Sequence, residues 1–172
     1  GRYVSYRRHD TRILCADPEV SVFYDGYRAA LAGEPWRQLT CEGGSRVEGI
    51  GRPRVEPSFI PTSVDAMVKV PDALALAAMR QVSRRLGRRV GGSTGTNFIG
   101  VLQAAQWMRE AGRGGSIVTI LCDSGERYAH SYYDPSWYER MGIDVVGADA
   151  VLAAVLAGGA LPALPVSSLE TI

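Results

Sequence analysis

Lysine is nearly absent from this sequence: Lys69 is the only one, and arginine supplies the remaining positive side chains. Lysine and arginine together number 19 against 18 acidic residues, so the net charge is +1. Such a balance gives no electrostatic reason to expect nucleic acid or an acidic membrane surface as a partner. No apolar run approaches the length of a membrane span, and we expect no membrane association.

Cysteine is scarce as well. The three cysteines, Cys15, Cys41 and Cys122, are odd in number and widely spaced. This spacing is typical of neither a disulfide framework nor a zinc site, so we expect no metal and a reducing, cytoplasmic setting. The chain has 172 residues, of which 46% are hydrophobic and 22% charged. That length and composition predict one globular domain with a substantial core.

Strand and helix patterns alternate along the chain, which predicts an α/β layered fold. Short apolar runs predict strands at 11–16, 67–70 and 116–121. The β-branched run at 116–121 is the clearest signal for a buried strand, which we expect to be central and parallel. Helical periodicity predicts further elements, namely the end of a helix at 1–8 and helices at 20–32, 72–86, 98–108 and 136–141. Residues 147–164 are rich in Ala, Leu and Gly and suggest either an interface helix or a loose tail.

Residues 91–97, Gly-Gly-Ser-Thr-Gly-Thr-Asn, predict a glycine-rich turn that opens the helix at 98–108. A helix start offers unpaired N–H groups and the positive end of the helix dipole. Glycine allows a ligand to approach the backbone closely. The turn therefore suggests a binding site for an anionic or polar ligand, and an ordinary Ser/Thr-capped helix start explains the same residues equally well.

Two other polar, glycine-bearing loops lie at 47–53 and 122–128. Ligands of α/β sheets bind beyond the carboxyl ends of the strands. Because all three loops lie between regular elements, we expect them to converge at that edge. Convergence of three such loops favours a real site more strongly than any one of them.

The motifs in these loops carry a resemblance. Val-Glu-Gly-Ile-Gly at 47–51, Phe-Ile-Pro at 59–61, Gly-Gly-Ser-Thr-Gly at 91–95 and Asp-Ser-Gly-Glu-Arg-Tyr at 123–128 occur in the order and spacing of one enzyme family. The chain resembles the cysteine synthase and cystathionine β-synthase family, which are fold-type II enzymes dependent on pyridoxal 5′-phosphate. It looks most similar to an actinobacterial branch of cysteine synthases and cysteine desulfhydrases. The resemblance covers residues 1 to about 144.

The resemblance implies a three-layer αβα fold with a mostly parallel sheet, like that of the tryptophan synthase β-subunit. It implies that Ser93 faces the pyridine nitrogen of the cofactor. The other implied cofactor-binding residues are Gly91, Gly92, Gly95, Asp123 and Ser124. Gly49, Ile50 and Gly51 resemble the loop on the substrate side. The implied chemistry is β-elimination or β-replacement on cysteine, serine or O-acetylserine, with a homodimer as the full-length form.

The lysine that forms the Schiff base in this family lies in the N-terminal half, and Lys69 matches no catalytic position. We therefore expect no catalytic residue in this chain and interpret Lys69 as a solvated surface residue. Residues 1–146 resemble the C-terminal half of the catalytic region, followed by a tail at 147–172, so the chain looks truncated and inactive alone. Two alternatives stay open: a non-catalytic homologue that binds a partner or regulates, and a binder of another phosphate ligand.

Overall fold

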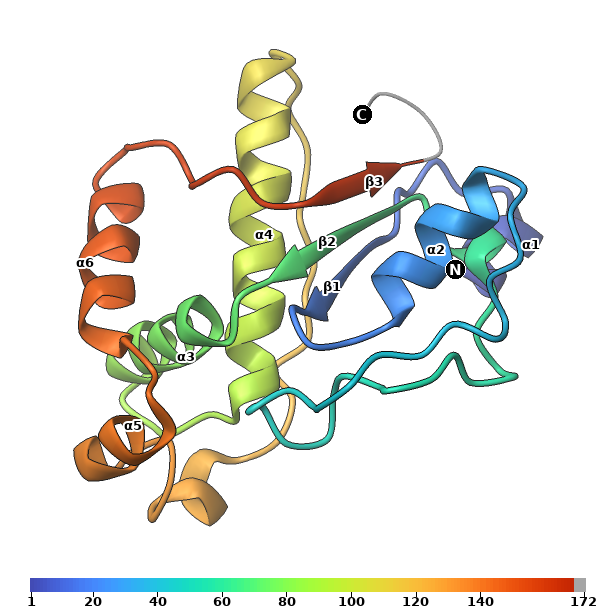
Figure 1. The fold of residues 1–172 in the computed structure, drawn as a ribbon. Helices are drawn as coiled ribbons and strands as arrows, with labels where there is room; N and C mark the ends of the chain where they lie inside the picture. Colours follow the sequence, from blue (N-terminus) through green and yellow to red (C-terminus); the bar gives the residue numbers. More distant parts are fainter. Residues whose placement is uncertain (169–172) are drawn as a thin grey trace.

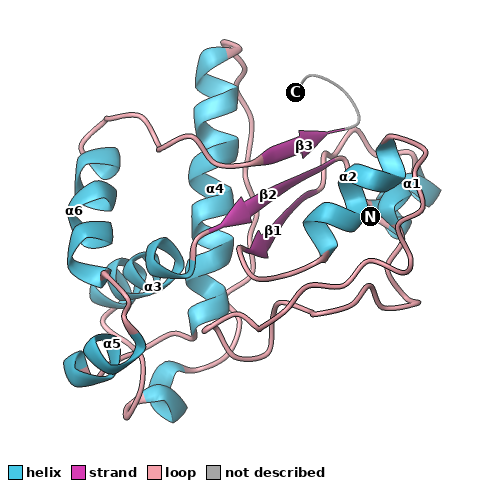
Figure 2. Ribbon diagram, in the orientation of Figure 1, coloured by secondary structure: helices cyan, strands magenta, loops and turns pink. Residues whose placement is uncertain are grey.

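The computed structural model describes residues 1–168 as a mixed α/β structure with a small sheet and surrounding helices (Figures 1 and 2). A long connection without regular strands or α-helices joins α2 to β2, apart from one 3₁₀ turn. The elements, in chain order, are α1 (Arg2–Arg7), β1 (Leu14–Pro18), α2 (Phe23–Leu31), η1 (Pro61–Ser63), β2 (Ala66–Val70), α3 (Asp72–Leu86), α4 (Gly92–Glu110), η2 (Gly125–Tyr128), α5 (Pro135–Met141), α6 (Val145–Leu156) and β3 (Val166–Ser168).

The sheet has the order β1-β2-β3, with β2 in the centre. β1 and β2 run parallel, with Leu14 opposite Ala66, whereas β3 runs antiparallel to β2. The sheet is therefore mixed. Side chains alternate across β2: Met67 packs with the aromatic residues of α2, and Val68 belongs to the main core that also contains α3 and α4 residues. Helices thus cover both faces of the sheet.

Helix α3 agrees with its prediction at both ends. Pro71 is the N-cap, and Gly87 ends the helix with a left-handed conformation at φ 64°. A residue without a Cβ is the usual choice for that conformation. The apolar face of α3 is buried against α4 and α6, and its fully buried members include Leu76 and Met79.

Helix α4 starts earlier than predicted. Gly91 is the N-cap with extended backbone (φ −74°, ψ 163°), and the helix begins at Gly92. The stretch predicted as a turn at 91–97 is therefore almost entirely helical. Its glycines disfavour a helix intrinsically, but tertiary packing offsets that cost. A Cβ on Gly95 would overlap the backbone of α3 at Ala75 and Met79, so this glycine allows the two helices to touch.

The prediction of a buried strand at 116–121 is wrong for this structure. The segment is exposed and has no strand assignment, with Val118 91% and Ile120 69% exposed. It extends back alongside α4 as an irregular trace (Figure 1). A strand needs a neighbour for its backbone groups. Among residues 1–168, no backbone group pairs with the backbone of this segment.

Residues 147–164 resolve into a helix and a connection. α6 packs against α3 and buries Val145, Ala148 and Leu152, and the carboxylate of Asp144 accepts a hydrogen bond from the Gly147 N–H at its start. The expected division after residue 146 falls within α6 and stays a prediction, while residues 169–172 of the expected tail lie outside the described part. No described helix has the length and hydropathy of a membrane span.

We expect Gly95→Ala to lower the free energy of unfolding by about 1–3 kcal/mol, although alanine is the better helix former. The added methyl group would overlap backbone atoms of α3, which cannot rotate away as a side chain could. The measurement is the urea midpoint. Gly114→Ala is the control, because a Cβ there meets open space. Equal midpoints for the two variants would show that α3 and α4 do not pack through Gly95.

Candidate functional site

The start of α4 lies where the three predicted loops meet. The Gly91 N–H donates to the Asp123 carbonyl at 3.0 Å, and Val90 forms an antiparallel bridge with Ser124. Within the first turn of the helix, the Thr94 hydroxyl accepts the Cys122 N–H at 3.0 Å. These bonds hold residues 122–124 against the first turn of α4, as the sequence predicted.

Two glycines make this approach possible. A Cβ on Gly91 would collide with the Asp123 carboxylate. A Cβ on Gly92 would lie 2.9 Å from Val47 Cγ1 and 3.2 Å from Tyr132 Cε2. Real Cβ atoms are rarely this close to other atoms, so the absence of both side chains lets the segment around residue 47 reach the helix start. The convergence of the three loops is confirmed.

Ser93 differs from its two hydroxyl-bearing neighbours. Thr94 accepts the Cys122 N–H, and Thr96 is fully buried with its hydroxyl 3.5 Å from the Gly92 carbonyl. Ser93 is half-buried in the first turn of α4, and no group within residues 1–168 hydrogen-bonds its hydroxyl. A partly shielded hydroxyl without a protein partner is available to a ligand.

Asp123 is positioned by an aromatic neighbour. Its Oδ2 accepts a hydrogen bond from the Tyr128 hydroxyl at 2.6 Å, and Arg127 lies 4.0 Å away. Its Oδ1 is buried and has no hydrogen-bond partner among the described atoms. Burial raises the pKa of Tyr128, and the hydrogen bond to Asp123 raises it further, so the phenol stays a donor. Ser124 is exposed and caps η2 by accepting the Glu126 N–H at 3.4 Å.

The expected substrate-side loop has two residues that need left-handed backbone. Gly49 has φ +85° and Gly51 has φ +78°, values that side chains other than glycine rarely adopt. Ile50, between them, is half-buried and packs against the main core. The chain before this turn is fixed by Asp72, whose carboxylate accepts bonds from the Ser45 hydroxyl at 2.9 Å and from the Arg46 N–H.

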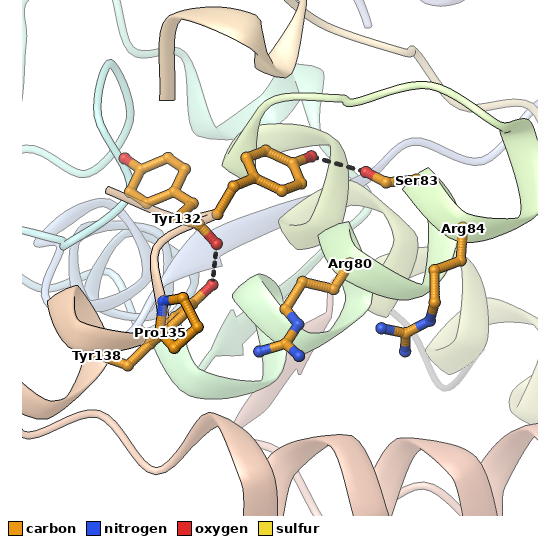
Figure 3. Close-up of a pocket in the computed structure, with 7 residues that line it drawn as sticks. Arg80, Ser83, Arg84, Tyr132, Pro135 and Tyr138 are labelled. Atoms are coloured by element: carbon orange, nitrogen blue, oxygen red, sulfur yellow. Dashed lines mark hydrogen bonds between the residues drawn. The ribbon is translucent and has the colours of Figure 1, made fainter. Parts of the chain in front are cut away.

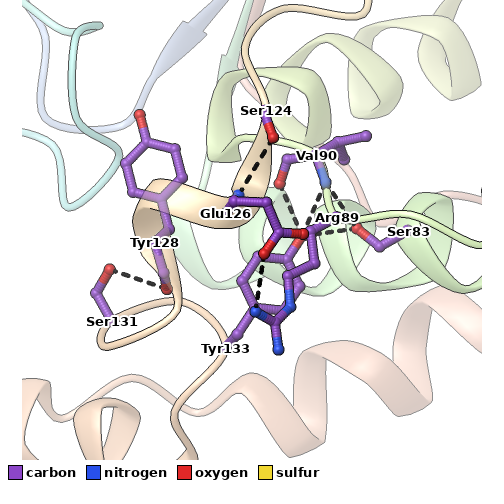
Figure 4. A network of polar contacts seen from close by, with 8 residues as sticks. All are labelled: Ser83, Arg89, Val90, Ser124, Glu126, Tyr128, Ser131 and Tyr133. Atoms are coloured by element: carbon purple, nitrogen blue, oxygen red, sulfur yellow. Dashed lines mark hydrogen bonds and ion pairs between the residues drawn. The ribbon is translucent and has the colours of Figure 1, made fainter.

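Two consecutive tyrosines have polar roles that the sequence did not reveal. The Tyr132 hydroxyl donates to the Arg46 carbonyl at 3.0 Å and accepts the Glu48 N–H at 2.7 Å. The Tyr133 hydroxyl donates to the Val90 carbonyl at 2.7 Å and accepts the Val90 N–H at 3.0 Å (Figure 4). The aromatic residues at 132–138 do pack in or against the main core, but no local pattern could indicate bonds to residues 40 or more positions away.

A pocket of about 210 Å³ lies behind these tyrosines (Figure 3). Two of its lining residues, Arg80 and Arg84, each come within 3.5 Å of the same Asp149 carboxylate. The remaining lining residues are Ser83, Tyr132, Tyr133, Pro135 and Tyr138. In Figure 3 the Tyr138 hydroxyl reaches the Tyr132 carbonyl. The Tyr133 hydroxyl lies 2.7 Å from the Ser83 hydroxyl. This pocket supports the tyrosine pair from behind and contains none of the predicted ligand-binding residues.

Lys69 is not a solvated surface lysine, and that interpretation needs correction. Its ammonium lies 2.9 Å from Asp25 Oδ2 and 5.5 Å from the centre of the Tyr24 ring, and its side chain is only 20% exposed. Both partners belong to α2. The side chains that alternate with Lys69 on β2, Val68 and Val70, pack in the main core with α4 residues. Lys69 therefore points to the opposite face of the sheet from α4.

No cluster of three or more His, Cys, Asp or Glu side chains that could hold a metal ion occurs within residues 1–168. The three cysteines are unpaired in the same part of the chain.

Comparison with known proteins identifies the class. The family model described as "Pyridoxal-phosphate dependent enzyme" matches residues 1–123, which is most of the chain. The chain belongs to this family, whose members depend on pyridoxal phosphate.

Individual relatives narrow the similarity. The L-cysteine desulfhydrase Cds1 of Mycobacterium tuberculosis is 51% identical over 152 residues, which cover 88% of this chain and 40% of that protein. An N-(2-amino-2-carboxyethyl)-L-glutamate synthase of Ralstonia nicotianae is 34% identical, covering 76% of this chain and 36% of that protein. A cysteine synthase of Dictyostelium discoideum is 30% identical, covering 70% of this chain and 32% of that protein. The chain thus spans about two fifths or less of the length of these relatives.

The residues at the start of α4 fit one edge of the cofactor. The hydroxyl of Ser93 has no partner among residues 1–168 and could donate to the ring nitrogen. Gly91 and Gly92 are buried, and the missing side chains let Asp123, Val47 and Tyr132 pack beside Ser93. Lys69 is the only lysine and is paired with Asp25, so nothing described here offers an amine to the cofactor's aldehyde carbon. The chemistry of Ser93 is thus compatible with the ring nitrogen of the cofactor, and we expect the covalent partner elsewhere.

Burial of the tyrosine cluster predicts a specific dependence of stability on pH. Burial raises the pKa of Tyr132 and of Tyr138 to about 12. A tyrosine in the unfolded chain has a pKa of about 10. The stabilisation from each phenol is therefore complete below pH about 10 and is lost as pH rises through about 12.

We expect the urea midpoint to be nearly constant from pH 8 to 10 and to fall between pH 10 and 12. The loss should be smaller in Tyr138→Phe, which has no phenol to ionise, once its midpoint is normalised to its value at pH 8. An identical alkaline loss in Tyr138→Phe would show that this phenol does not contribute through its raised pKa.

Proposed function

We propose that this chain is the C-terminal part of a pyridoxal-phosphate-dependent enzyme that carries out β-elimination or β-replacement on cysteine, serine or O-acetylserine. The observation that carries the proposal is the half-buried hydroxyl of Ser93 at the start of α4, which has no partner among residues 1–168 and lies where three loops converge. The relatives named L-cysteine desulfhydrase and cysteine synthase support the reaction class. The choice between elimination and replacement is left to experiment.

The bound cofactor supplies an electron-accepting ring that stabilises negative charge developing on an amino-acid substrate. In this proposal Ser93 donates a hydrogen bond to the ring nitrogen. Gly91 and Gly92 contribute by letting Asp123 and Val47 pack closely at the start of α4, beside the proposed ring position, and Asp123 and Ser124 back the turn that holds Ser93. The proposal also includes Gly95, which lies in the same segment as Ser93. Its close contact with α3 is by itself a sufficient reason for a glycine at this position.

The nature of the group at position 93 supports this reaction type. A carboxylate at the ring nitrogen would hold a proton on it and strengthen the ring as an electron acceptor. A neutral hydroxyl does not stabilise that proton, so charge is drawn less strongly into the ring. Loss of the substituent on the β-carbon then competes well. The residues at 49–51 would flank the substrate on the other side, with Gly49 and Gly51 in the left-handed conformation that shapes the turn.

The proposal extends to the architecture of the whole enzyme. Residues 116–121 expose an apolar, β-branched run that forms no backbone–backbone hydrogen bond within residues 1–168, although the Asn97 amide donates to the Ile120 carbonyl at 3.3 Å. We propose that the rest of the enzyme covers this run and completes a larger, mostly parallel sheet with helices on both faces. The share of each relative that the chain spans, about two fifths or less, supports a longer protein. A homodimer is the proposed assembly.

Substitution of Ser93 tests the function directly. Ser93→Ala in the full-length protein should keep the fold and weaken cofactor binding by one hydrogen bond, about 1 kcal/mol. Ser93→Asp should slow β-elimination of cysteine sharply and shift the cofactor's visible absorption, because a carboxylate changes the protonation of the ring nitrogen. Ser93→Thr, which keeps a hydroxyl, is the matched control and should stay close to the parent. Parent-like turnover and absorption in both Ala and Asp variants would refute the assignment of Ser93.

Lys69 provides a second test. Because its ammonium is paired with Asp25, borohydride reduction of the full-length holoprotein should attach the cofactor to a different lysine, identified by peptide mapping. Lys69→Arg keeps the positive charge and should retain both the reduced adduct and turnover. A label on Lys69, or loss of the adduct in Lys69→Arg, would contradict the proposal that the covalent partner lies outside this chain.

A further inference from the structure

We infer that Tyr132 and Tyr133 are positioning residues that separately fix the two sides of the proposed site: Tyr132 fixes the substrate-side loop, and Tyr133 fixes the segment that leads to Ser93. The inference rests on the proposed function, because it assigns the two loops to substrate and cofactor. It concerns two adjacent tyrosines that lie outside all the motifs carrying the family resemblance.

The Tyr132 hydroxyl bonds the substrate-side loop both as a hydrogen-bond donor and as an acceptor. It donates to the Arg46 carbonyl and accepts the Glu48 N–H, at 3.0 and 2.7 Å. These backbone groups lie immediately before Gly49. The ring is 1% exposed and stacks on Tyr128, with ring centres 4.6 Å apart. Burial raises the pKa of Tyr132 to about 12, so its hydroxyl keeps the proton that it donates at neutral pH.

Tyr133 connects to the cofactor side in the same manner. Its hydroxyl donates to the Val90 carbonyl and accepts the Val90 N–H, and it lies 2.7 Å from the Ser83 hydroxyl of α3. Val90 immediately precedes Gly91, the N-cap of α4. The guanidinium of Arg89 lies 5.0 Å from the centre of the Tyr133 ring (Figure 4). The position of Ser93 therefore depends on the hydrogen bonds of Tyr133 to Val90, three residues before Ser93 in the chain.

One short turn holds both tyrosines. The Tyr133 N–H donates to the Tyr128 carbonyl, the Asp134 N–H donates to the Ser131 carbonyl, and the Tyr138 hydroxyl donates to the Tyr132 carbonyl. Because adjacent residues of one turn hold the two loops, the spacing between substrate and cofactor sides is set by the turn itself. Each hydroxyl, however, contacts only one loop, so the two contributions can be separated by mutation.

Three conservative variants of the full-length holoprotein test the inference: Tyr132→Phe, Tyr133→Phe and Tyr138→Phe. Each loses one phenolic hydroxyl from the same cluster, so each should cost some stability. Tyr138→Phe is the matched control, because its hydroxyl bonds the turn and neither loop. The readouts are kcat and KM for cysteine at saturating cofactor, the cofactor's dissociation constant and visible absorption, and hydrogen exchange of the Glu48 amide.

We expect Tyr132→Phe to raise KM about tenfold, as the loss of a hydrogen bond to a loop that must be ordered predicts, with little change in kcat. Its Glu48 amide should exchange faster, and its cofactor absorption and affinity should match the parent. Tyr133→Phe should weaken cofactor binding and shift the absorption, with parent-like KM once cofactor is saturating. Tyr138→Phe should match the parent in every readout except stability.

The outcomes separate this inference from the proposed function. A parent protein that turns over cysteine, together with parent-like KM in Tyr132→Phe or parent-like cofactor binding in Tyr133→Phe, would overturn the inference alone. The same rise in KM and the same weakening of cofactor binding in all three variants would also overturn it, because a general structural role would then explain the data. A parent that carries out neither elimination nor replacement on these amino acids would overturn the proposed function and the inference with it.

Discussion

The close crossing of α3 and α4 is the constraint on which the rest of this structure depends. At Gly95 the backbone of α4 approaches that of α3 at Ala75 and Met79 so closely that no Cβ fits between them. This contact fixes where α4 begins, and therefore where Ser93 lies. The same pair of helices is joined a second time through the Ser83 and Tyr133 hydroxyls, which meet at Val90 just before the start of α4. Packing of two helices thus determines the geometry of a site that lies at one end of them.

Hydrogen-bonded aromatic rings, more than ion pairs, stabilise the loops around that end. The ion pair between Arg89 and Glu126 joins side chains that are 44% and 70% exposed, and such surface pairs contribute little in water. By contrast, Tyr132 is buried and satisfies two backbone groups of another loop. Buried polar groups are costly to leave unpaired, so a bond of this kind specifies one loop conformation. A site that must align two ligand-facing loops gains from bonds with that specificity.

Local sequence signals predicted the regular elements well where neighbouring residues decide the structure. α3 has Pro71 at its start and Gly87 at its end, and both positions were readable directly. The helix at 92–97 could not be predicted from the sequence, because glycine and hydroxyl residues are typical of loops. Only contact with α3 makes these residues helical. The apolar run at 116–121 has the composition of a buried strand, yet a strand also needs a partner, which residues 1–168 do not provide. The predicted loops do converge, while the tyrosines that hold them there bond residues more than 40 positions away and leave no local pattern.

The central claim is that the Ser93 hydroxyl faces the ring nitrogen of the cofactor. The most direct test is the nitrogen-15 chemical shift of the full-length holoprotein loaded with pyridoxal phosphate labelled at that nitrogen. We predict the shift of an unprotonated nitrogen that accepts a hydrogen bond, and a change to the shift of a protonated nitrogen in Ser93→Asp. A protonated ring nitrogen in the parent protein would contradict the account. So would a nitrogen-15 shift that is the same in the parent and in Ser93→Asp.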